Sequence, residues 1–431
     1  MRRTQKHRRH YVASSCVKIF FISLVFLYGI FVLRWQVEEA APKSLAGEPS
    51  RVKNGLEIGR NQSLRSLPPG GGVPAIVTEN LSLASHRHSV GERRTAAPAA
   101  AEFDVTLVSH ATTEKLWLVS EMCQRWQGPV IIALLLSNDG VLPPSATSIR
   151  CVEWVAVRDA SGKSGYPVNT LRNAAIDRVK TSHFLMVDAD FLPSADLHSK
   201  ILRIDAQDGN RWLGNLKLAL VVPAFEVKPP VQGCSSSRAL GTQQGGAADI
   251  QAAALEACRR ALAPLSETVP TTQHGLRICV QAKKCSAFQE HSSWDSHSTT
   301  GSKKWFQDTR VRPLSCFLSS RYEPYVVLRR SPEVTPAYDE RFKGYGKNKI
   351  SHISQLRWAN FEFAVMPGGF LIHVPHLRSD AKEAWLASSR LHKSTDALYT
   401  KFFKELQAST KGGPLTKLCS RDPPRAKTNK A

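Results

Sequence analysis

The chain has 431 residues, of which 42% are hydrophobic and 22% are charged, and its formal net charge is +22. That length holds one large domain or two to three small ones, and the composition is ordinary for a folded protein. Part of the positive charge is local, because basic residues crowd positions 1–10 and 421–430. No zinc-finger spacing and no aromatic-basic RNA motif accompanies it, so we predict no nucleic-acid partner.

The first hydrophobic segment predicts a membrane anchor. Residues 19–33 carry no charge, and five Lys or Arg residues precede them within the first ten positions. We predict a cytosolic basic tail at 1–11 and a type II signal anchor at 12–33, with everything after it in the lumen. The alternative is a cleaved signal peptide, which would need a small-residue cleavage site, whereas Arg34, Trp35 and Gln36 follow.

Residues 34–101 are rich in Pro, Gly, Ser, Ala and Arg and predict a flexible stem. Asn61 and Asn80 begin glycosylation sequons, as suits a lumenal segment. Beyond Cys16, eight cysteines remain, which can form up to four disulfides in an oxidising compartment.

Strand and helix patterns alternate from residue 102 to residue 410, which predicts an α/β catalytic domain. Apolar runs predict strands at 104–109, 130–136, 151–157, 183–187, 218–222, 325–328, 361–365 and 370–374. Helical periodicity predicts helices at 113–126, 168–180 and 347–358. A low-complexity stretch at about 229–270 predicts an insertion with a short helix at 250–262, and 411–431 predict a disordered basic tail.

The aspartates of Asp188-Ala189-Asp190 follow a buried strand at 183–187. Ligands of parallel sheets collect beyond the carboxyl ends of the strands. Two carboxylates there suit Mn²⁺ or Mg²⁺, completed by the oxygens of a diphosphate. The alternative is a solvated turn at the end of a strand.

Two further clusters could join the aspartates. Residues 166–173 open a helix, where Arg172 suits a phosphate or a sugar carboxylate, unless this side chain only covers the helix surface. His373 ends an apolar strand and could supply an imidazole to the same metal, unless it is simply hydrogen-bonded. His376 lies two residues outside that strand and is the weaker candidate.

Residues 338–349 combine glycines and aromatic rings with carboxylates, which suits a sugar-binding loop. We predict that Glu340, Tyr345 and Asn348 bind substrate, with Asn348 orienting the acceptor. A surface turn before a helix is the alternative.

These motifs together resemble glycosyltransferase family 49. The matching segments, in family order from about residue 104 to about residue 376, are DVTLVSH, WQGP, YPVNTLRNAAI, HFLMVDADFLP, ALVVPAFE, YEPYVVLRR, YDERFKGYGKNK and FLIHVPH. The resemblance implies a GT-A fold, a mixed and mostly parallel sheet flanked by helices. It also implies a UDP-sugar donor, glucuronic acid in the characterised members, a glycan acceptor, Mn²⁺ or Mg²⁺, and a Golgi membrane location. A homo- or hetero-oligomer in the Golgi stays open.

The resemblance also assigns residues. The positions that match its metal site are Asp188, Asp190 and His373. The positions that match its donor-binding segment are Asn169, Arg172 and Asn173, beside the two aspartates.

The acceptor and the catalytic base do not transfer. Residues 229–310 differ from the family in sequence and length, and Arg321 stands where related sequences have an aspartate. Many inverting GT-A enzymes place an acid after a Gly-aromatic-Gly turn, whereas this chain has no carboxylate at 347–349. Our candidate bases are therefore Asp339 and Glu323. Two alternative functions remain: a transferase that uses another UDP-sugar donor, and a non-catalytic glycan-binding protein that keeps the fold.

Overall fold

The computed structural model describes residues 77–80, 104–136, 141–158, 165–207, 212–230, 234 and 247–420. The chain divides into two units, 1–70 and 71–431, and all described residues belong to the second. The predicted basic tail, the predicted anchor and residues 421–431 lie outside the described residues, as does most of the stem. Within the described ranges, no helix is long and apolar enough to cross a membrane.

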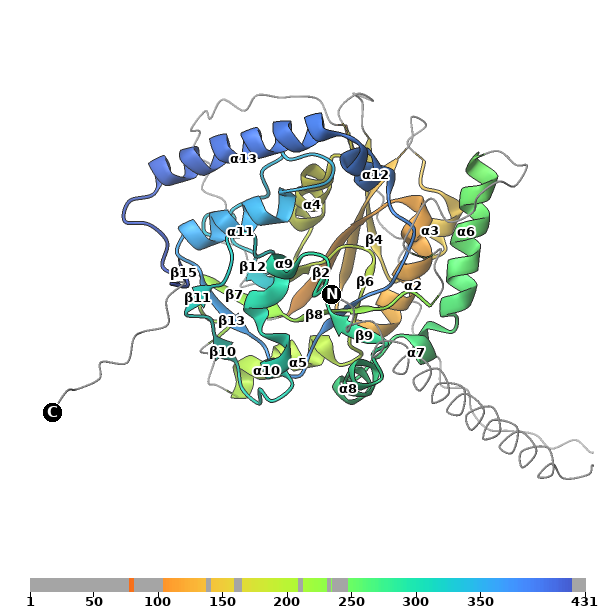
Figure 1. The fold of residues 1–431 in the computed structure, drawn as a ribbon, viewed down its shortest axis with the longest axis horizontal. Helices are drawn as coiled ribbons and strands as arrows, with labels where there is room; N and C mark the ends of the chain where they lie inside the picture. Colours follow the sequence, from red (N-terminus) through yellow and green to blue (C-terminus); the bar gives the residue numbers. More distant parts are fainter. Residues whose placement is uncertain are drawn as a thin grey trace, which may run out of the picture. The chain divides into compact units, whose positions relative to one another are not determined.

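A nine-stranded sheet forms the centre of this unit, in the order β1-β4-β3-β2-β5-β12-β7-β13-β10 (Figure 1). Its strands are β1 (Val77–Asn80), β2 (Val105–Ala111), β3 (Val130–Leu136), β4 (Glu153–Arg158), β5 (His183–Met186), β7 (Leu218–Val222), β10 (Arg312–Pro313), β12 (Tyr325–Arg329) and β13 (Glu362–Val365). The pairing is parallel except at β12, which runs against both neighbours, and at β10. The fold is therefore a mixed, mostly parallel α/β sheet.

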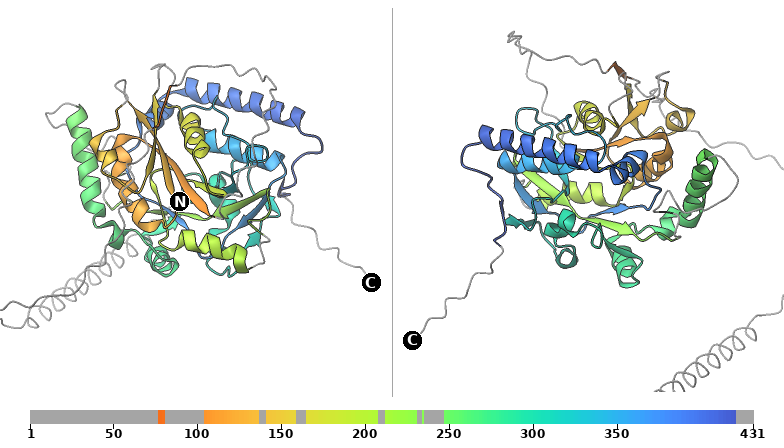
Figure 2. Two further views of the ribbon diagram at one scale, coloured as in Figure 1. Left: turned by 180° about the vertical axis from the view of Figure 1, so that it is seen from behind. Right: turned by 45° about the horizontal axis from the view of Figure 1, so that its top comes forward.

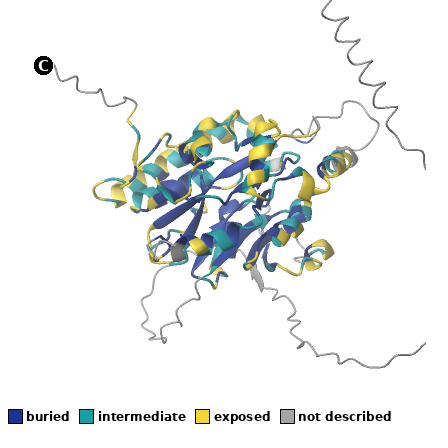
Figure 3. Ribbon diagram, turned by 90° about the horizontal axis from the view of Figure 1, so that it is seen from below, coloured by how far each residue is buried: buried dark blue, intermediate teal, exposed yellow. Residues whose placement is uncertain are grey.

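Helices cover both faces of the sheet, which explains the continuous apolar runs. Figure 1 shows α4 (Val168–Asp177), α11 (Asn348–Trp358) and α13 (Ser389–Ser409) above the sheet and α5 (Leu197–Gln207) below it. The opposite view in Figure 2 has the same arrangement. In Figure 3, the strands are buried and the outer faces of the helices are exposed.

A smaller sheet brings one predicted strand to a different place. The strand predicted at 370–374 is present as β14 (Leu371–His373), and it lies in a separate four-stranded sheet of order β6-β14-β8-β9. β14 pairs with β6 (Phe191–Pro193) and β8 (Ala224–Val227), and β8 pairs in turn with the edge strand β9 (Cys285–Ala287). Antiparallel pairing sets His373 opposite Phe191, one residue after Asp190. This pairing draws the C-terminal part of the domain to the aspartates.

The remaining helices lie before residue 150, between residues 247 and 305, and at 380–387. They are α2 (Leu116–Arg125), which follows the 3-10 turn η1 (Thr113–Lys115), α3 (Pro144–Thr147), α6 (Ala247–Leu262), α7 (Leu265–Thr268), α8 (Gln273–Gln281), α9 (Trp294–His297), α10 (Ser302–Trp305) and α12 (Asp380–Ala387). A further 3-10 turn, η3 (Ser298–Thr300), follows α9.

Two expected boundaries change. Strand β1 lies inside the predicted stem and pairs in parallel with β4. The predicted disordered tail is wrong for residues 411–420, because β15 (Lys417–Leu418) pairs with β11 (Cys316–Phe317) and Cys419 forms a disulfide with Cys316. Composition signals disorder only when nothing else holds a segment, and here a strand pair and a covalent bond hold it.

Eight cysteines form four disulfides, the number that the sequence allows. The pairs are Cys123–Cys151, Cys234–Cys258, Cys279–Cys285 and Cys316–Cys419. Three of the pairs connect positions that are 24 to 103 residues apart along the chain.

Candidate active site

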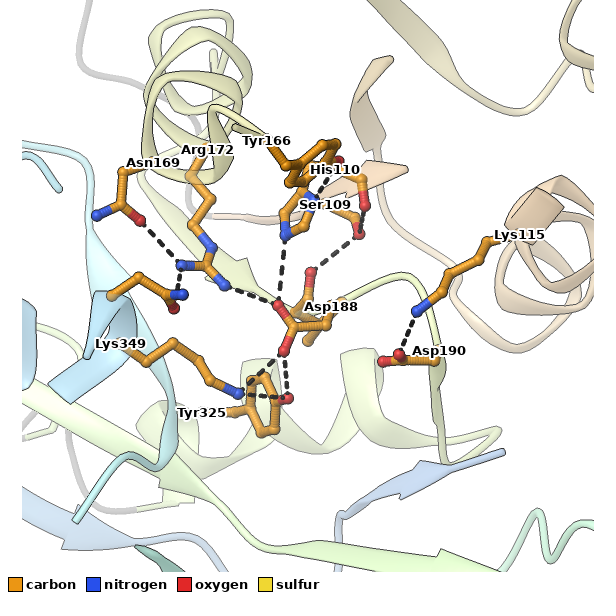
Figure 4. A network of polar contacts seen from close by, with 12 residues as sticks. Ser109, His110, Lys115, Tyr166, Asn169, Arg172, Asp188, Asp190, Tyr325 and Lys349 are labelled. Carbon is orange, nitrogen blue, oxygen red and sulfur yellow. Dashed lines mark hydrogen bonds and ion pairs between the residues drawn. The ribbon is translucent and has the colours of Figure 1, made fainter. Parts of the chain in front are cut away.

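Asp188 leaves the carboxyl end of β5 and lies among basic and hydroxyl groups (Figure 4). Its Oδ1 accepts a hydrogen bond from Arg172 Nη2 at 2.9 Å. Its Oδ2 accepts from Tyr325 Oη at 2.8 Å and from Lys349 Nζ at 2.9 Å. His110 Nε2 is 3.4 Å from Oδ1, while His110 Nδ1 is 2.9 Å from the Tyr166 hydroxyl. Both carboxylate oxygens of Asp188 are therefore engaged by protein groups.

The charge state of Asp188 follows from these contacts. Burial raises the pKa of the carboxyl group, but Lys349 and Arg172 outweigh burial and hold the pKa well below its usual 3.8. Asp188 is ionised at neutral pH and acts as the shared anion of two cations.

Asp190 lies in a separate cluster. Its Oδ2 is 2.5 Å from Lys115 Nζ, 2.7 Å from His376 Nε2 and 4.0 Å from His373 Nε2. Asp190, His373 and His376 can each offer one ligand atom, and these atoms lie within 4.8 Å of one another. Within the described residues, His376 thus joins Asp190 and His373, while Asp188 is paired with Arg172 and Lys349. The metal set of Asp188, Asp190 and His373 stays a prediction. The turn after β14 swings His376 back toward Asp190, which strand periodicity cannot show.

The chemistry of this donor set fits a divalent transition metal. Two imidazoles and one carboxylate are a typical ligand set for such ions. Burial lowers the pKa of His373 to about 3, so its imidazole is neutral and keeps a free lone pair. The ring packs against Phe191 and Phe288, each at 5.2 Å between centroids, which fixes its orientation. The Lys115 ammonium shares the same carboxylate oxygen and must move aside when a metal binds.

Arg172 is held by a chain of amides. Its Nη1 donates to Asn169 Oδ1 and to Asn348 Oδ1, both at 3.0 Å, and the side chain is 3% exposed. Asn169 Nδ2 in turn donates to the carbonyl of Asp339 at 2.7 Å. Asn348 is predicted to orient the acceptor. In the structure its side-chain oxygen accepts a hydrogen bond from Arg172, and its side-chain nitrogen donates to the Gly344 carbonyl. Asn169 and Asn348 therefore position Arg172 against Asp188.

Asn173 and Glu340 connect α4 to the loop that precedes α11. Asn173 Nδ2 donates to the Tyr338 carbonyl and to Glu340 Oε1, both at 2.9 Å. Glu340 Oε2 accepts from the Thr170 hydroxyl at 3.0 Å. These contacts give both residues a structural role, and their predicted contacts with donor and substrate stay predictions.

The two candidate bases lie in different surroundings. The Asp339 carboxylate pairs with Arg341 Nη2 at 2.6 Å, and Arg341 also binds Glu405 on α13. Glu323 precedes β12 and is half-buried, and its backbone N–H donates to the Ser296 carbonyl at 2.9 Å. Burial raises the pKa of Glu323, the Lys349 charge lowers it, and the nearby Asp188 charge raises it further. A raised pKa makes a carboxylate a stronger base, which favours Glu323.

Tyr345, whose predicted contact with substrate stays a prediction, lies in the turn before α11. Its side chain is 39% exposed, and burial together with the Glu323 charge raises the pKa of the phenol. The ring lies 6.0 Å from the Trp385 ring, which holds the loop from the other side.

Sequence reasoning missed several residues of the site. They are His110, Lys115, Tyr325 and Lys349, while His376 was named only as the weaker of two candidate histidines. His110, Tyr325 and Lys349 fall in quoted motifs and Lys115 in a predicted helix, so position along the chain was the available signal. Their convergence was not, because they come from β2, η1, β12 and α11.

Comparison with known proteins identifies relatives of this chain. The profile of glycosyltransferase family 49, described as a glycosyl-transferase for dystroglycan, matches residues 144–243 and 263–410. Xylosyl- and glucuronyltransferase LARGE1 of Homo sapiens is 30% identical over 293 residues, which are 65% of this chain and 32% of LARGE1. LARGE2 of Mus musculus is 29% identical over 315 residues, which are 70% of this chain and 39% of LARGE2. The chain thus spans about a third of the length of these curated relatives.

Among solved structures, S. aureus TarS aligns with a TM-score of 0.34 and 10% identity, over 62% of this chain and 36% of TarS. The TarS fragment 1–349 in complex with UDP-GlcNAc aligns with a TM-score of 0.34 and 9% identity, over 64% of this chain and 59% of that one. Likeness at this level carries no argument about fold or ligand. The family match covers more than half of the chain and shows that this protein belongs to glycosyltransferase family 49.

Proposed function

We propose that the protein is a metal-dependent, inverting glycosyltransferase of GT-A fold that moves glucuronic acid from UDP to a glycan acceptor. The observation that carries the proposal is that the two aspartates after β5 have different partners. Two cations bind Asp188, whereas two histidines lie beside Asp190. Family membership supports a transferase, and the names of the LARGE relatives support xylose or glucuronic acid as the sugar.

Asp190, His373 and His376 would hold the metal. Their two nitrogen donors favour Mn²⁺ over Mg²⁺, which prefers oxygen. The bound ion would offset the charge of the departing nucleoside diphosphate.

Glu323 is the proposed base. The acceptor hydroxyl loses its proton to the Glu323 carboxylate and its oxygen bonds to the anomeric carbon. The bond from that carbon to the diphosphate oxygen breaks, and UDP leaves with the electron pair. The cations Arg172 and Lys349 hold the pKa of Asp188 low, so that its carboxylate is too weak a base to compete for this proton.

We also propose residues 12–33 as a Golgi membrane anchor with the catalytic domain in the lumen. The four disulfides support an oxidising compartment. Protease protection of the C-terminal domain in sealed Golgi vesicles tests this topology, and digestion without detergent contradicts it.

A donor screen on the full chain tests the activity. Purified protein with Mn²⁺ is offered UDP-glucuronic acid, UDP-xylose and UDP-N-acetylglucosamine, and UDP release is measured before an acceptor screen on a glycan array. We expect UDP-glucuronic acid to be the preferred donor. Preference for another sugar supports the alternative donor, and folded protein without turnover of any donor supports a non-catalytic glycan-binding protein.

A further inference from the structure

A cavity lies apart from the two aspartates, lined by residues of α2, of α6 and of the segment that begins with α3. Figure 1 shows where these three helices lie. Its volume is about 590 Å³, within the usual range for ligand pockets of roughly 300–1,000 Å³. Residues from all three walls line it, among them Trp117, Ser120, Ser148, Arg150, Leu255 and Arg259.

The lining suits a carbohydrate. Trp117 and Leu255 are half-buried and give an apolar wall, and the serine hydroxyls stand beside it. Indole rings pack against the C–H faces of sugars, while hydroxyl groups exchange hydrogen bonds with sugar hydroxyls. A lipid would need a more apolar lining than this one, which contains serines and charged side chains.

The charges favour an acidic sugar. The Arg259 guanidinium lies 5.5 Å from the centre of the Trp117 ring, and Arg150 is exposed at the rim. The only acid that pairs with Arg259 in the described part of the chain is Glu256, at 3.7 Å between half-exposed side chains, which is a weak contact. Glu114 also lines the cavity, but one carboxylate stands against two guanidiniums. A carboxylate or sulfate on a sugar would pair with both.

Two disulfides make these walls rigid. Cys151 lines the cavity and is bonded to Cys123 on α2. Cys258, the neighbour of Arg259, is bonded to Cys234, and both are fully buried. A preformed wall lowers the entropy lost on binding, as expected for a built site.

Consecutive residues of the chain connect the wall of the cavity to the active site. Thr113 and Glu114 line it, and the next residue, Lys115, reaches Asp190 at 2.5 Å. We propose that this cavity binds an anionic oligosaccharide, an acidic part of the acceptor glycan remote from the hydroxyl that receives the new sugar. The word acceptor rests on the proposed transferase function, whereas the binding itself does not.

Calorimetry on the full chain in detergent tests the site with defined probes. Hyaluronan tetrasaccharide carries carboxylates, heparin tetrasaccharide carries sulfates as well, and chitotetraose is neutral. We expect the acidic probes to bind about tenfold more tightly than chitotetraose, with a gap that closes as salt screens the guanidiniums. R150Q/R259Q should abolish that preference. R260Q is the matched control, because Arg260 is exposed on the same helix but does not line the cavity.

Each outcome has a meaning. Binding of heparin alone makes the ligand group a sulfate and still supports an anionic site. Equal binding of chitotetraose, equal losses in R259Q and R260Q, or no binding of any probe overturns the proposal. UDP-sugar hydrolysis without acceptor should be unchanged in all variants. If the acidic probes bind but no UDP-sugar is hydrolysed, the result contradicts the transferase proposal and still supports the anionic binding site.

Discussion

His376 Nε2 lies 2.7 Å from Asp190 Oδ2, closer than His373 Nε2 at 4.0 Å. The outer histidine of the HVPH segment is thus the nearer partner of the carboxylate. The candidate metal site that we propose is therefore Asp190, His373 and His376, where the sequence predicts Asp188, Asp190 and His373.

H376A should weaken metal binding. Loss of one of three protein ligands is expected to raise the Mn²⁺ concentration for half-maximal activity by at least about tenfold, comparable with the 10–100-fold losses known for weaker outer-shell changes. Manganese binding by electron paramagnetic resonance checks this without relying on turnover. H274A, at an exposed position on α8, is the control. Unchanged binding in H376A would return the site to the two aspartates.

R172M should destabilise the fold, because it leaves the half-buried Asp188 with one cation fewer. Removal of one partner from a buried pair costs about 3 kcal/mol of unfolding free energy. R172M/D188N should recover part of this loss in urea unfolding. Equal stability of R172M and the wild type would contradict the cationic role.

The same pair predicts a pH dependence. The pKa of Asp188 is lower in the folded state than its usual 3.8, so its stabilising contribution is complete above that value and is lost as the pH falls through the folded pKa. The stability gap between the wild type and R172M should therefore narrow on acidification below about pH 4.

E323Q should lower kcat by about 100-fold or more, the usual contribution of a general base, with little change in the donor KM. The base works only when ionised, and burial raises its pKa above the usual 4.5. Wild-type kcat/KM should thus rise with pH through that elevated pKa, and E323Q should lack this limb. D339N is the comparison, since Asp339 pairs with Arg341. If D339N lost the acid limb and E323Q kept it, Asp339 would be the base.

G346A should disturb the loop that carries Asn348 and Lys349. Gly346 has a φ of +95°, and an added Cβ would lie 2.7 Å from the Trp385 ring. We expect a loss of about 1–3 kcal/mol in unfolding free energy and a lower kcat. G344A separates the two causes, because Gly344 has a φ of +68° but open space around it. Equal costs in both variants would show that Trp385 does not press on the turn.

C316S/C419S should destabilise the domain more than C279S/C285S. The first bond closes a separation of 103 residues and the second a separation of 6. Chain entropy predicts a loss of about 4 kcal/mol for a loop near 100 residues and much less for a short one. Thermal unfolding of the two double variants tests the ranking. The reverse order would mean that β15 is held by packing alone.

The local sequence determined much of this fold. The apolar run at 130–136 became β3 with unchanged bounds, and 168–180 became α4 with a shorter end, because strand and helix periodicity are local properties. The sequence also determined that Asp188 and Asp190 leave a buried strand at its carboxyl end, since an apolar strand before a polar turn is visible in one segment.

Only the tertiary structure decided what the two aspartates do. Lys349 is 161 positions from Asp188, and His376 lies outside any regular strand, so neither partnership leaves a periodic signal. Likewise, the pairing of Cys419 with Cys316 ordered a tail whose composition indicated disorder. Side chains from distant segments meet only when the sheet forms, and only then do two cations lie against Asp188 and two histidines against Asp190.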